Sequence, residues 1–492
     1  MRAGTVPRKR WMGALLVAAA CGGGGDTVLA TAVPARGAGV AAAAGDTVRV
    51  WMTTGNRAAL LARQPDLFFA AAANGNPTVT VDPSVAYQAM DGFGYTLTGG
   101  SATVINRLST TARAALLQEL FGRGEGELGI SFIRLSIGAS DLSAAPFTYD
   151  DVPAGQTDPT LARFSIDAER ADLLPVLKQA LAINPQLKII ATPWTAPVWM
   201  KDNGSFVGGS LPRANFPVYA QYFLKYLQAM KAEGIAIHAI TPQNEPLYAG
   251  NNPSMYMSAA DQAELIKNHL GPVLRAAGFD TRIVAYDHNA DHPEYPISIL
   301  DDAAAKAYVD GSAFHLYGGT IDALSQVHAA HPDRNLYFTE QYTGAGGSFS
   351  GDLRWHVRNV LVGAPANWSR VVLEWNLAND EAWGPHTSGG CSDCLGAVTI
   401  QGGSGAVTRN VAYYIIGHAS RFVPAGSVRV GSTVTNAGKT AKLVQAAFRT
   451  PAGKTVLIAM NDGQRAQSFN ISSGGRIVTH SLAVGSVATY VW

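Results

Sequence analysis

The sequence predicts an α/β protein, a (β/α)8 TIM barrel with an attached all-β sandwich domain. Between residues 91 and 423, eight short apolar runs alternate with longer helical patterns, which is typical of a parallel barrel. In residues 46–90 and 424–492, runs of β character follow one another without helical patterns. The chain of 492 residues also has room for a barrel of about 250 residues and a second domain.

The predicted barrel strands are short runs rich in β-branched, aromatic and other apolar side chains. They are Phe93–Leu97, Phe132–Ile137, Lys188–Pro193, Ile237–Thr241, Arg282–Tyr286, Ala313–Tyr317, Leu336–Thr339 and Arg370–Trp375. Each is followed by a stretch in which apolar residues recur every three or four positions, as in Phe223, Tyr226, Leu227 and Met230. The predicted helices are Thr110–Leu120, Ala168–Leu181, Pro217–Ala232, Ala259–Ala276, Ser298–Tyr308, Ile321–His328, Asp352–Leu361 and Val411–Phe422.

The sandwich is predicted to combine both ends of the folded chain. Residues 46–90 contain the alternating runs Thr47–Trp51 and Thr78–Val81. Residues 424–492 contain four further strand-like runs, Ser427–Val430, Lys442–Arg449, Thr455–Met460 and Ala488–Trp492. Neither end has enough strands for a sandwich by itself, so we expect the two ends to pair in one domain.

The first 21 residues are predicted to be an export signal. Lys9 and Arg10 precede an apolar run, Trp11–Ala20, that is about half as long as a membrane-spanning helix. The small residues before Cys21 resemble a bacterial lipoprotein cleavage site, and cleavage after Ala32 is the alternative. Residues 22–45, rich in Gly, Ala and Thr, are predicted to form a flexible tether. We therefore expect a periplasmic, cell-surface or secreted protein that meets a membrane only through a lipid on Cys21.

The composition excludes some classes of partner. There are 37 basic and 36 acidic side chains, so the chain lacks the basic excess typical of nucleic-acid-binding proteins, and a neutral partner such as a sugar fits better. In an oxidising compartment, Cys391 and Cys394 are expected to form a local disulfide in a surface loop. A zinc site or a redox-active pair is the alternative, although neither further ligands nor a helix start is evident nearby.

Two glutamates are the candidate catalytic groups. The fourth and seventh predicted strands end at Glu245 and Glu340, and active sites of such barrels lie at the carboxyl ends of the strands. Hydrolysis of a glycosidic bond needs two carboxyl groups, one protonated and one ionised, on either side of that bond. The alternative interpretation is a pair of solvated loop glutamates.

Seven segments of the chain resemble glycoside hydrolase family 30, which includes glucosylceramidases and bacterial β-1,6-glucanases. They occur in the order that the family shows: Asp91–Gly94, Phe132–Leu135, Thr192–Pro197, Gln243–Pro246, Phe314–Tyr317, Phe338–Glu340 and Glu374–Leu377. The resemblance implies a retaining β-glycosidase with Glu245 as acid/base and Glu340 as nucleophile. Asn244 can then donate to the sugar 2-hydroxyl, a contact that strengthens in the transition state. Arg134 is predicted beside Glu340, where its charge would keep that carboxylate ionised.

Other polar and aromatic residues at the predicted barrel mouth are candidates for substrate binding. Tyr317 is placed to donate to the nucleophile and His315 to line the pocket. Trp194 and Trp375 follow strands three and eight, where their rings can form a floor for a sugar, with core packing as the alternative. Glu374 can bind hydroxyl groups or serve a structural role.

One departure from the family bears on the substrate. Glucosylceramidases of the family carry an Asp after the first strand, and Gly99 stands at the expected position, which favours a glucan chain over a ceramide glucoside. The segment Asp287–His292 has metal-ligand residue types, but we interpret it as a polar loop. The predicted chemistry needs neither a metal nor another cofactor.

The predicted substrate is a β-1,6-linked glucan or a related β-glucoside. Glucosylceramide or a small glucoside is the first alternative. A surface lipoprotein that binds glucan without cleaving it is the second, and the presence of both carboxylates argues against it.

Overall fold

The computed structural model describes residues 47–70, 74–435 and 442–492. The predicted signal at residues 1–21, the lipid site at Cys21 and the tether at residues 22–45 lie outside this range. Within the described residues, none of the helices is both long enough and apolar enough to cross a bilayer.

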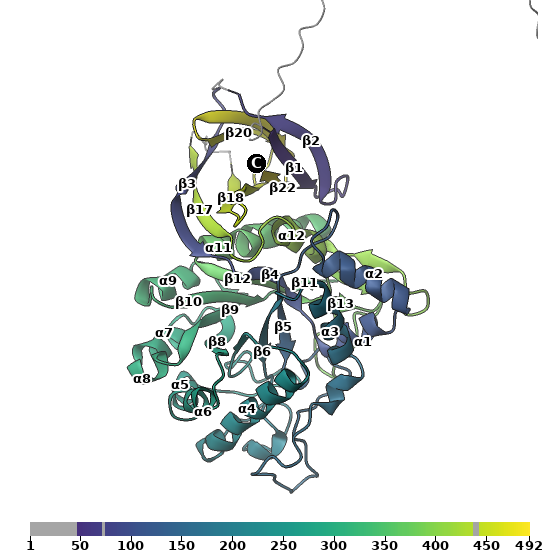
Figure 1. Ribbon diagram of the computed structural model, residues 1–492, viewed down its shortest axis with the longest axis vertical. Helices are drawn as coiled ribbons and strands as arrows, with labels where there is room; N and C mark the ends of the chain where they lie inside the picture. The colour runs from purple at the N-terminus through teal and green to yellow at the C-terminus, as the bar shows by residue number, and fades with distance from the viewer. Residues whose placement is uncertain (1–46, 71–73, 436–441) are drawn as a thin grey trace, which may run out of the picture. The chain divides into compact units, whose positions relative to one another are not determined.

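Eight parallel strands close into a barrel in the order β10-β12-β4-β5-β6-β7-β8-β9 (Figure 1). Their bounds are β4 Gly92–Thr96, β5 Phe132–Ser136, β6 Lys188–Thr192, β7 Ala239–Ile240, β8 Arg282–Ala290, β9 Val309–Gly319, β10 Asn335–Glu340 and β12 Ser369–Asn376. All eight predicted strands are therefore present, and the predicted barrel is confirmed. β7 is shorter than predicted and β8 is longer, reaching Ala290.

Helices follow the barrel strands, as the sequence pattern predicted. They are α1 Gly99–Asn106, α2 Thr110–Phe121, α3 Leu173–Ile183, α4 Phe216–Ala232, α5 Ala259–Leu265, α6 Gly271–Ala276, α7 Glu294–Asp301, α8 Ala303–Lys306, α9 Ala323–Ala330, α10 Phe349–His356, α11 Gly363–Ala366 and α12 Val411–Ser420. The π-helical segments η4 Ile266–Leu270 and η5 Val357–Leu361 continue α5 and α10. The unpredicted α1 contains two glycines at its start, and the Thr98 side chain caps it by accepting a hydrogen bond from the Ser101 amide.

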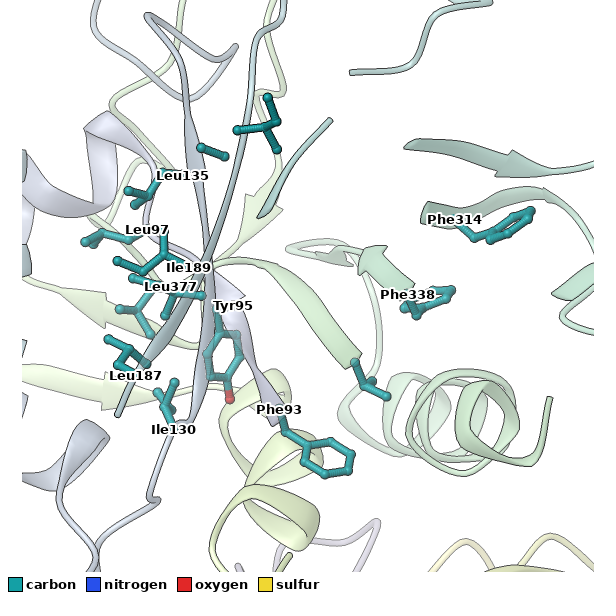
Figure 2. Close-up of a cluster of buried hydrophobic side chains, with 14 of the residues drawn as sticks. Phe93, Tyr95, Leu97, Ile130, Leu135, Leu187, Ile189, Phe314, Phe338 and Leu377 are labelled. Atoms are coloured by element: carbon teal, nitrogen blue, oxygen red, sulfur yellow. The ribbon is translucent and has the colours of Figure 1, made fainter. Parts of the chain in front are cut away.

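The alternation of side chains along each strand divides the barrel core into two parts. On β5, Ile133 and Leu135 face the surrounding helices and join the large core, part of which Figure 2 shows. Phe132 faces the barrel lumen and packs in a separate cluster with residues of the other strands: Ile190, Ala239, Val284, Ala313, Tyr337, Val371 and Leu373. Because the lumen is filled with apolar side chains at this level, Arg134, two positions further along, lies above that filling at the barrel mouth.

The second domain is a nine-stranded sheet with the order β2-β1-β22-β19-β18-β17-β3-β20-β21. The bounds are β1 Thr47–Thr53, β2 Ala62–Phe68, β3 Thr78–Ala89, β17 Val428–Thr435, β18 Leu443–Arg449, β19 Thr455–Asn461, β20 Gln467–Ser473, β21 Arg476–Leu482 and β22 Val487–Val491. N-terminal β3 pairs with β17 and β20, which confirms that both ends of the chain build this domain. The sequence pattern missed β2, which contains Pro65 and Asp66, and also β20 and β21, whose side chains are mostly polar.

Hydrogen bonds join the barrel and the sandwich. His418 of α12 is buried and contacts Thr489 and Thr53 of the sandwich, with both distances 2.9 Å. Burial lowers the pKa of His418 to about 3, so the ring is neutral and serves as a polar link between the domains.

Short strands after β10 and β12 form two small sheets near the barrel mouth. β11 Thr343–Gly344 pairs with β14 Cys394–Leu395, and β13 Ala378–Asn379 pairs with β15 Val398–Ile400, which pairs with β16 Val407–Arg409. These pairings hold the loops that border the predicted active site.

Candidate active site

Arg134 is the cation at the centre of the site. Its side chain is fully buried and donates to Glu340, to Asn244 Oδ1 at 2.6 Å and to Asp287 Oδ2 at 2.8 Å. The guanidinium therefore ties together residues from strands two, four, five and seven of the barrel. Because an arginine presents several donors in a fixed plane, it can hold these three side chains in one geometry.

Two tryptophan rings face the same guanidinium. The centroids of the Trp194 and Trp375 rings lie 4.9 and 5.7 Å from the Arg134 guanidinium carbon, and 5.4 Å from each other. Both rings line the pocket, as the sequence predicted, yet only 2% and 3% of their surfaces are exposed. Such rings offer an edge or a small patch to a sugar and at the same time pack against the cation.

Glu245 and Glu340 lie face to face at the barrel mouth. One carboxylate oxygen of each, together with a nitrogen of His315, falls within 4.8 Å of the other two atoms. His315 Nδ1 lies 3.1 Å from Glu245 Oε1 and 3.8 Å from Glu340 Oε1. The Tyr317 hydroxyl donates to Glu340 Oε1 at 3.0 Å. The two glutamates predicted from the strand ends are thus brought together, with His315 and Tyr317 where the sequence placed them.

His315 is held as a cation by the acidic groups around it. Burial by itself lowers its pKa, but Glu340, Asp287 and Glu245 outweigh that effect and raise the pKa to about 9. The ring therefore carries a positive charge at neutral pH. A protonated imidazole cannot bind a metal ion, and Arg134 adds a second positive charge, so this cluster suits proton sharing better than metal binding.

The two carboxyl groups differ in proton affinity. Burial raises the pKa of Glu340, and the negative charges of Glu245 and Asp287 add to this effect, outweighing His315 and Arg134. Burial opposes ionisation of Glu245 as well, but its hydrogen bond and charge interaction with His315 lower its pKa overall. Arg134 lowers the pKa of Glu340, as expected, but burial and the neighbouring carboxylates outweigh this effect and leave the pKa raised overall.

The sequence analysis interpreted Asp287 as part of a polar loop, which is wrong. Asp287 is a buried anion within β8. β8 continues through residue 287, and the carboxylate receives hydrogen bonds from Arg134 and from the hydroxyls of Thr192, Thr241 and Thr339. Burial opposes its ionisation, but Arg134 and then His315 hold its pKa well below the usual range. Asp287 thus fixes the orientation of Arg134.

The backbone is strained at Glu245, after β7, and at an irregularity within β8. Glu245 has φ 45°, and Tyr286 and Asp287 have φ 75° and 72°, in the region that residues with a Cβ seldom adopt. The Glu245 amide donates to the Asp287 carbonyl at 2.9 Å, which links the two strained segments. The surrounding hydrogen bonds hold a conformation that aims Glu245 into the pocket.

A pocket of about 430 Å³ opens above these groups. Its lining includes Trp194, Trp375, Asp141 and the disulfide between Cys391 and Cys394. His288 and Tyr248 line it as well. The volume is in the range of small-ligand sites.

Asp141 is a site residue that the sequence analysis missed. It follows β5, is 5% exposed and lines the pocket, and its Oδ2 accepts a hydrogen bond from the Cys391 amide at 3.2 Å. Burial and then the charge of Glu340 raise its pKa to about 7. This carboxyl group follows the second barrel strand, so it does not replace the Asp that is absent at Gly99 after the first. The signal was the polar segment directly after the second strand, Ser140–Ser143.

The expected local disulfide is present. Cys391 and Cys394 are bonded across the exposed residues 392 and 393, and both also line the pocket, which the sequence did not predict. The Cys394 side chain packs in a cluster with Leu142, Trp194 and Trp375. Glu374 is 1% exposed and hydrogen-bonds His356 at 2.8 Å, so the structural one of its two predicted roles holds.

Comparison with known proteins identifies the family. Residues 90–423 match the model of the glycosyl hydrolase family 30 TIM-barrel domain, and residues 426–490 match that of the family 30 β-sandwich domain. The chain belongs to glycoside hydrolase family 30. It is therefore a glycoside hydrolase, and the resemblance drawn from the seven segments is confirmed.

Relatives within family 30 include β-1,6-glucanases and a glucosylceramidase. The endo-1,6-β-D-glucanase neg1 of Aspergillus fumigatus is 38% identical over 72% of this chain and 76% of its own length. The solved structure of the endo-β1,6-glucanase BT3312 has a TM-score of 0.84 at 36% identity, covering 90% of this chain and 99% of that chain. Lysosomal acid glucosylceramidase of Mus musculus is 28% identical over 84% of this chain and 83% of its length.

Proposed function

We propose that this family 30 enzyme cleaves β-1,6-linked glucan within the chain, with retention of anomeric configuration. The observation that carries the proposal is the approach of Glu245 and Glu340 to within 4.8 Å across the pocket. Retaining glycosidases need carboxyl groups about 5 Å apart, so that one attacks the sugar directly, whereas inverting enzymes leave room for a water molecule.

In the first step of the proposed reaction, a Glu340 oxygen attacks the anomeric carbon. The bond to the leaving oxygen breaks, its electron pair remains on that oxygen, and Glu245 supplies the proton. In the second step, Glu245 takes a proton from water, the water oxygen bonds to the anomeric carbon, and Glu340 departs as a carboxylate. Two inversions at the same carbon retain its configuration.

The reaction requires the proton on Glu245 and the charge on Glu340, the reverse of the preference in the sugar-free site. Protonated His315 can pass a proton to Glu245 over their 3.1 Å contact, and a closer approach than the present 3.8 Å to Glu340 Oε1 would let the ring take a proton back. Arg134 and the Tyr317 hydroxyl then stabilise the ionised Glu340. Proton relocation would thus accompany substrate binding.

The remaining pocket residues supply recognition in this proposal. Asn244 Oδ1 accepts from Arg134, which leaves its amide nitrogen to donate to the sugar 2-hydroxyl. Asp141 offers carboxylate oxygens to hydroxyls of the sugar that is attacked. His288 also lines the pocket, and its buried Nδ1 has no hydrogen-bond partner among the described residues, so we assign this ring to the leaving sugar.

The relatives favour β-1,6-glucan over glucosylceramide as the substrate. The β-1,6-glucanases are 36% and 38% identical to this chain, and the mouse glucosylceramidase is 28% identical. We therefore expect hydrolysis of pustulan, a β-1,6-glucan, to internal fragments, and much weaker activity on glucosylceramide. Glucosylceramide turnover that exceeds pustulan turnover would favour the alternative.

Rescue by azide tests the two catalytic roles separately. With an activated aryl β-glucoside, Glu340→Ala plus azide should yield the α-glucosyl azide, because azide replaces the nucleophile. Glu245→Ala plus azide should yield the β-glucosyl azide, because azide replaces water in the second step. The opposite pair of products would exchange the assignments, and wild-type turnover by either variant would refute them.

We also propose that the protein is exported, with lipidation at Cys21 as the more specific form of that proposal. The basic residues before the apolar run Trp11–Ala20 support export, and a disulfide fits an oxidising compartment. Mass spectrometry of the protein from its native host tests this. A mature chain beginning at lipid-modified Cys21 is expected, whereas a start near Val33 would indicate simple secretion.

A further inference from the structure

A second hollow adjoins the catalytic pocket on the outer side of β10. It has a volume of about 570 Å³ and shares the lining residues Tyr317 and Tyr342 with the catalytic pocket, so the two hollows lie on either side of these rings. We call it the rim groove and define it by six of its lining residues: Tyr317, Gln341, Tyr342, Asp352, Trp355 and His356. The groove runs from the end of β10 to helix α10.

Gln341 lines this groove and has a buried polar atom without a hydrogen-bond partner among the described residues. Side chains alternate along a strand, so Glu340 faces the lumen and Gln341 faces the opposite side, where the groove lies. Gln341 is 7% exposed, and its Oε1 has no hydrogen-bond partner among the described residues. Its carbonyl accepts from the Trp375 amide at 2.8 Å, which fixes the backbone. A buried acceptor without a partner is rare, and rotation of the side-chain amide toward the groove would let a ligand hydroxyl satisfy it.

The other lining residues match a neutral polyhydroxylated ligand. Tyr342 and Trp355 are both half-buried and offer aromatic faces to the apolar side of a sugar ring. Asp352 and His356 are one turn apart on α10 and add polar groups at the edge. Neither Lys nor Arg lines the groove, so it lacks the cations that a phosphate or another anion would require.

We propose that the rim groove binds a second glucosyl unit of the glucan chain whose neighbouring unit lies between Glu245 and Glu340. The inference rests on the proposed function, because an enzyme that cuts within a chain must hold units beyond the one attacked. Tyr342 borders both hollows and contacts Tyr317, with ring centroids 5.6 Å apart, so the chain passes over this pair of rings.

The test measures how kcat/KM depends on substrate length. The substrates are β-1,6-linked glucose oligomers from disaccharide to hexasaccharide and an aryl β-glucoside. For Trp355→Ala, the ratio of kcat/KM on the hexasaccharide to that on the aryl glucoside should fall about 10-fold, as expected for the loss of one aromatic contact with a sugar. Trp355→Phe should keep most of the ratio. Trp383→Ala removes an exposed tryptophan outside the groove and should leave the ratio unchanged.

A second variant covers the case in which Trp355→Ala fails to fold. Asp352→Asn keeps the side-chain volume and should lower the same ratio by several-fold. An unchanged ratio in the Asp352 and the folded Trp355 variants, or equal losses on all substrates, would overturn the inference.

The proposed function fails separately, if the wild-type enzyme leaves β-1,6-linked oligomers intact. In that case, binding of the hexasaccharide tests the rim groove independently of turnover. Its affinity is measured for the Glu340→Gln variant alone and for the same variant combined with Trp355→Phe or Asp352→Asn. Weaker binding in the groove variants supports it, and equal binding overturns it.

Discussion

The buried pair formed by Arg134 and Asp287 allows one substitution to test the architecture of the whole site. Asp287→Asn keeps the shape of the side chain but removes its charge and replaces one acceptor oxygen with a donor. At the observed 2.8 Å, an ion pair is worth about 6 kcal/mol at an effective dielectric constant of 20. Breaking a buried ion pair usually lowers the free energy of unfolding by about 3–5 kcal/mol. Because Arg134 keeps Glu340 as a partner, we expect a loss of about 3 kcal/mol for Asp287→Asn.

Thermal unfolding and steady-state kinetics together test this expectation. A loss of about 3 kcal/mol should lower Tm by roughly 6 °C, at about 2 °C per kcal/mol for a large domain. Because Arg134 also orients Asn244 and Glu340, kcat/KM should fall on the order of 100-fold. Asp280→Asn, at an exposed aspartate just before β8, is the matched control. If Tm and kcat/KM of Asp287→Asn equal those of the control, Asp287 does not organise the site.

Three further substitutions test individual features of the pocket. His315→Gln removes a cation that lowers the pKa of both catalytic carboxyls, so both limbs of the pH profile of kcat/KM should move to higher pH by about one unit; limbs that stay in place would contradict the assigned charge. Asp141→Asn should reduce kcat/KM at least 10-fold with little change in Tm, since its carboxylate faces the sugar; a variant with wild-type kinetics would remove Asp141 from recognition. Replacing Cys391 and Cys394 together by Ser should cost about 2 kcal/mol for so short a loop, yet raise KM because the pocket wall loosens; an unchanged KM would show that the wall does not depend on the bond.

The sequence predicted the barrel well because its signals are local. Each barrel strand is a short apolar run followed by a helical pattern, and the period of the pattern changes from strand to helix within a few residues. The sandwich was predicted less completely. In β20 the buried residues Phe469 and Ile471 alternate with polar ones, but Asn470 is also buried, because it bonds Asn74 and Thr479 of neighbouring segments. Such burial of a polar side chain depends on partners that are distant in sequence.

The candidate site shows the same difference between features that local sequence predicts and features that depend on distant partners. Glu245 and Glu340 were accessible to prediction because strand ends mark the mouth of a barrel. Asp287 was not, since its importance comes from four donors on four other strands, and the sequence around it resembles an exposed polar loop. The relative pKa values of Glu245 and Glu340 could not be predicted either, because they depend on the balance of burial, two cations and three carboxylates.

The charge balance of the cluster explains why one mobile proton is available for catalysis. Arg134 and His315 carry two positive charges, and Asp287, Glu245 and Glu340 would carry three negative ones if all were ionised. A buried cluster disfavours a net charge, so one further proton makes the group neutral. Asp287 cannot take it, because Arg134 and the threonine hydroxyls stabilise its ionised form. The proton is therefore confined to the two glutamates, the groups between which double displacement has to move it.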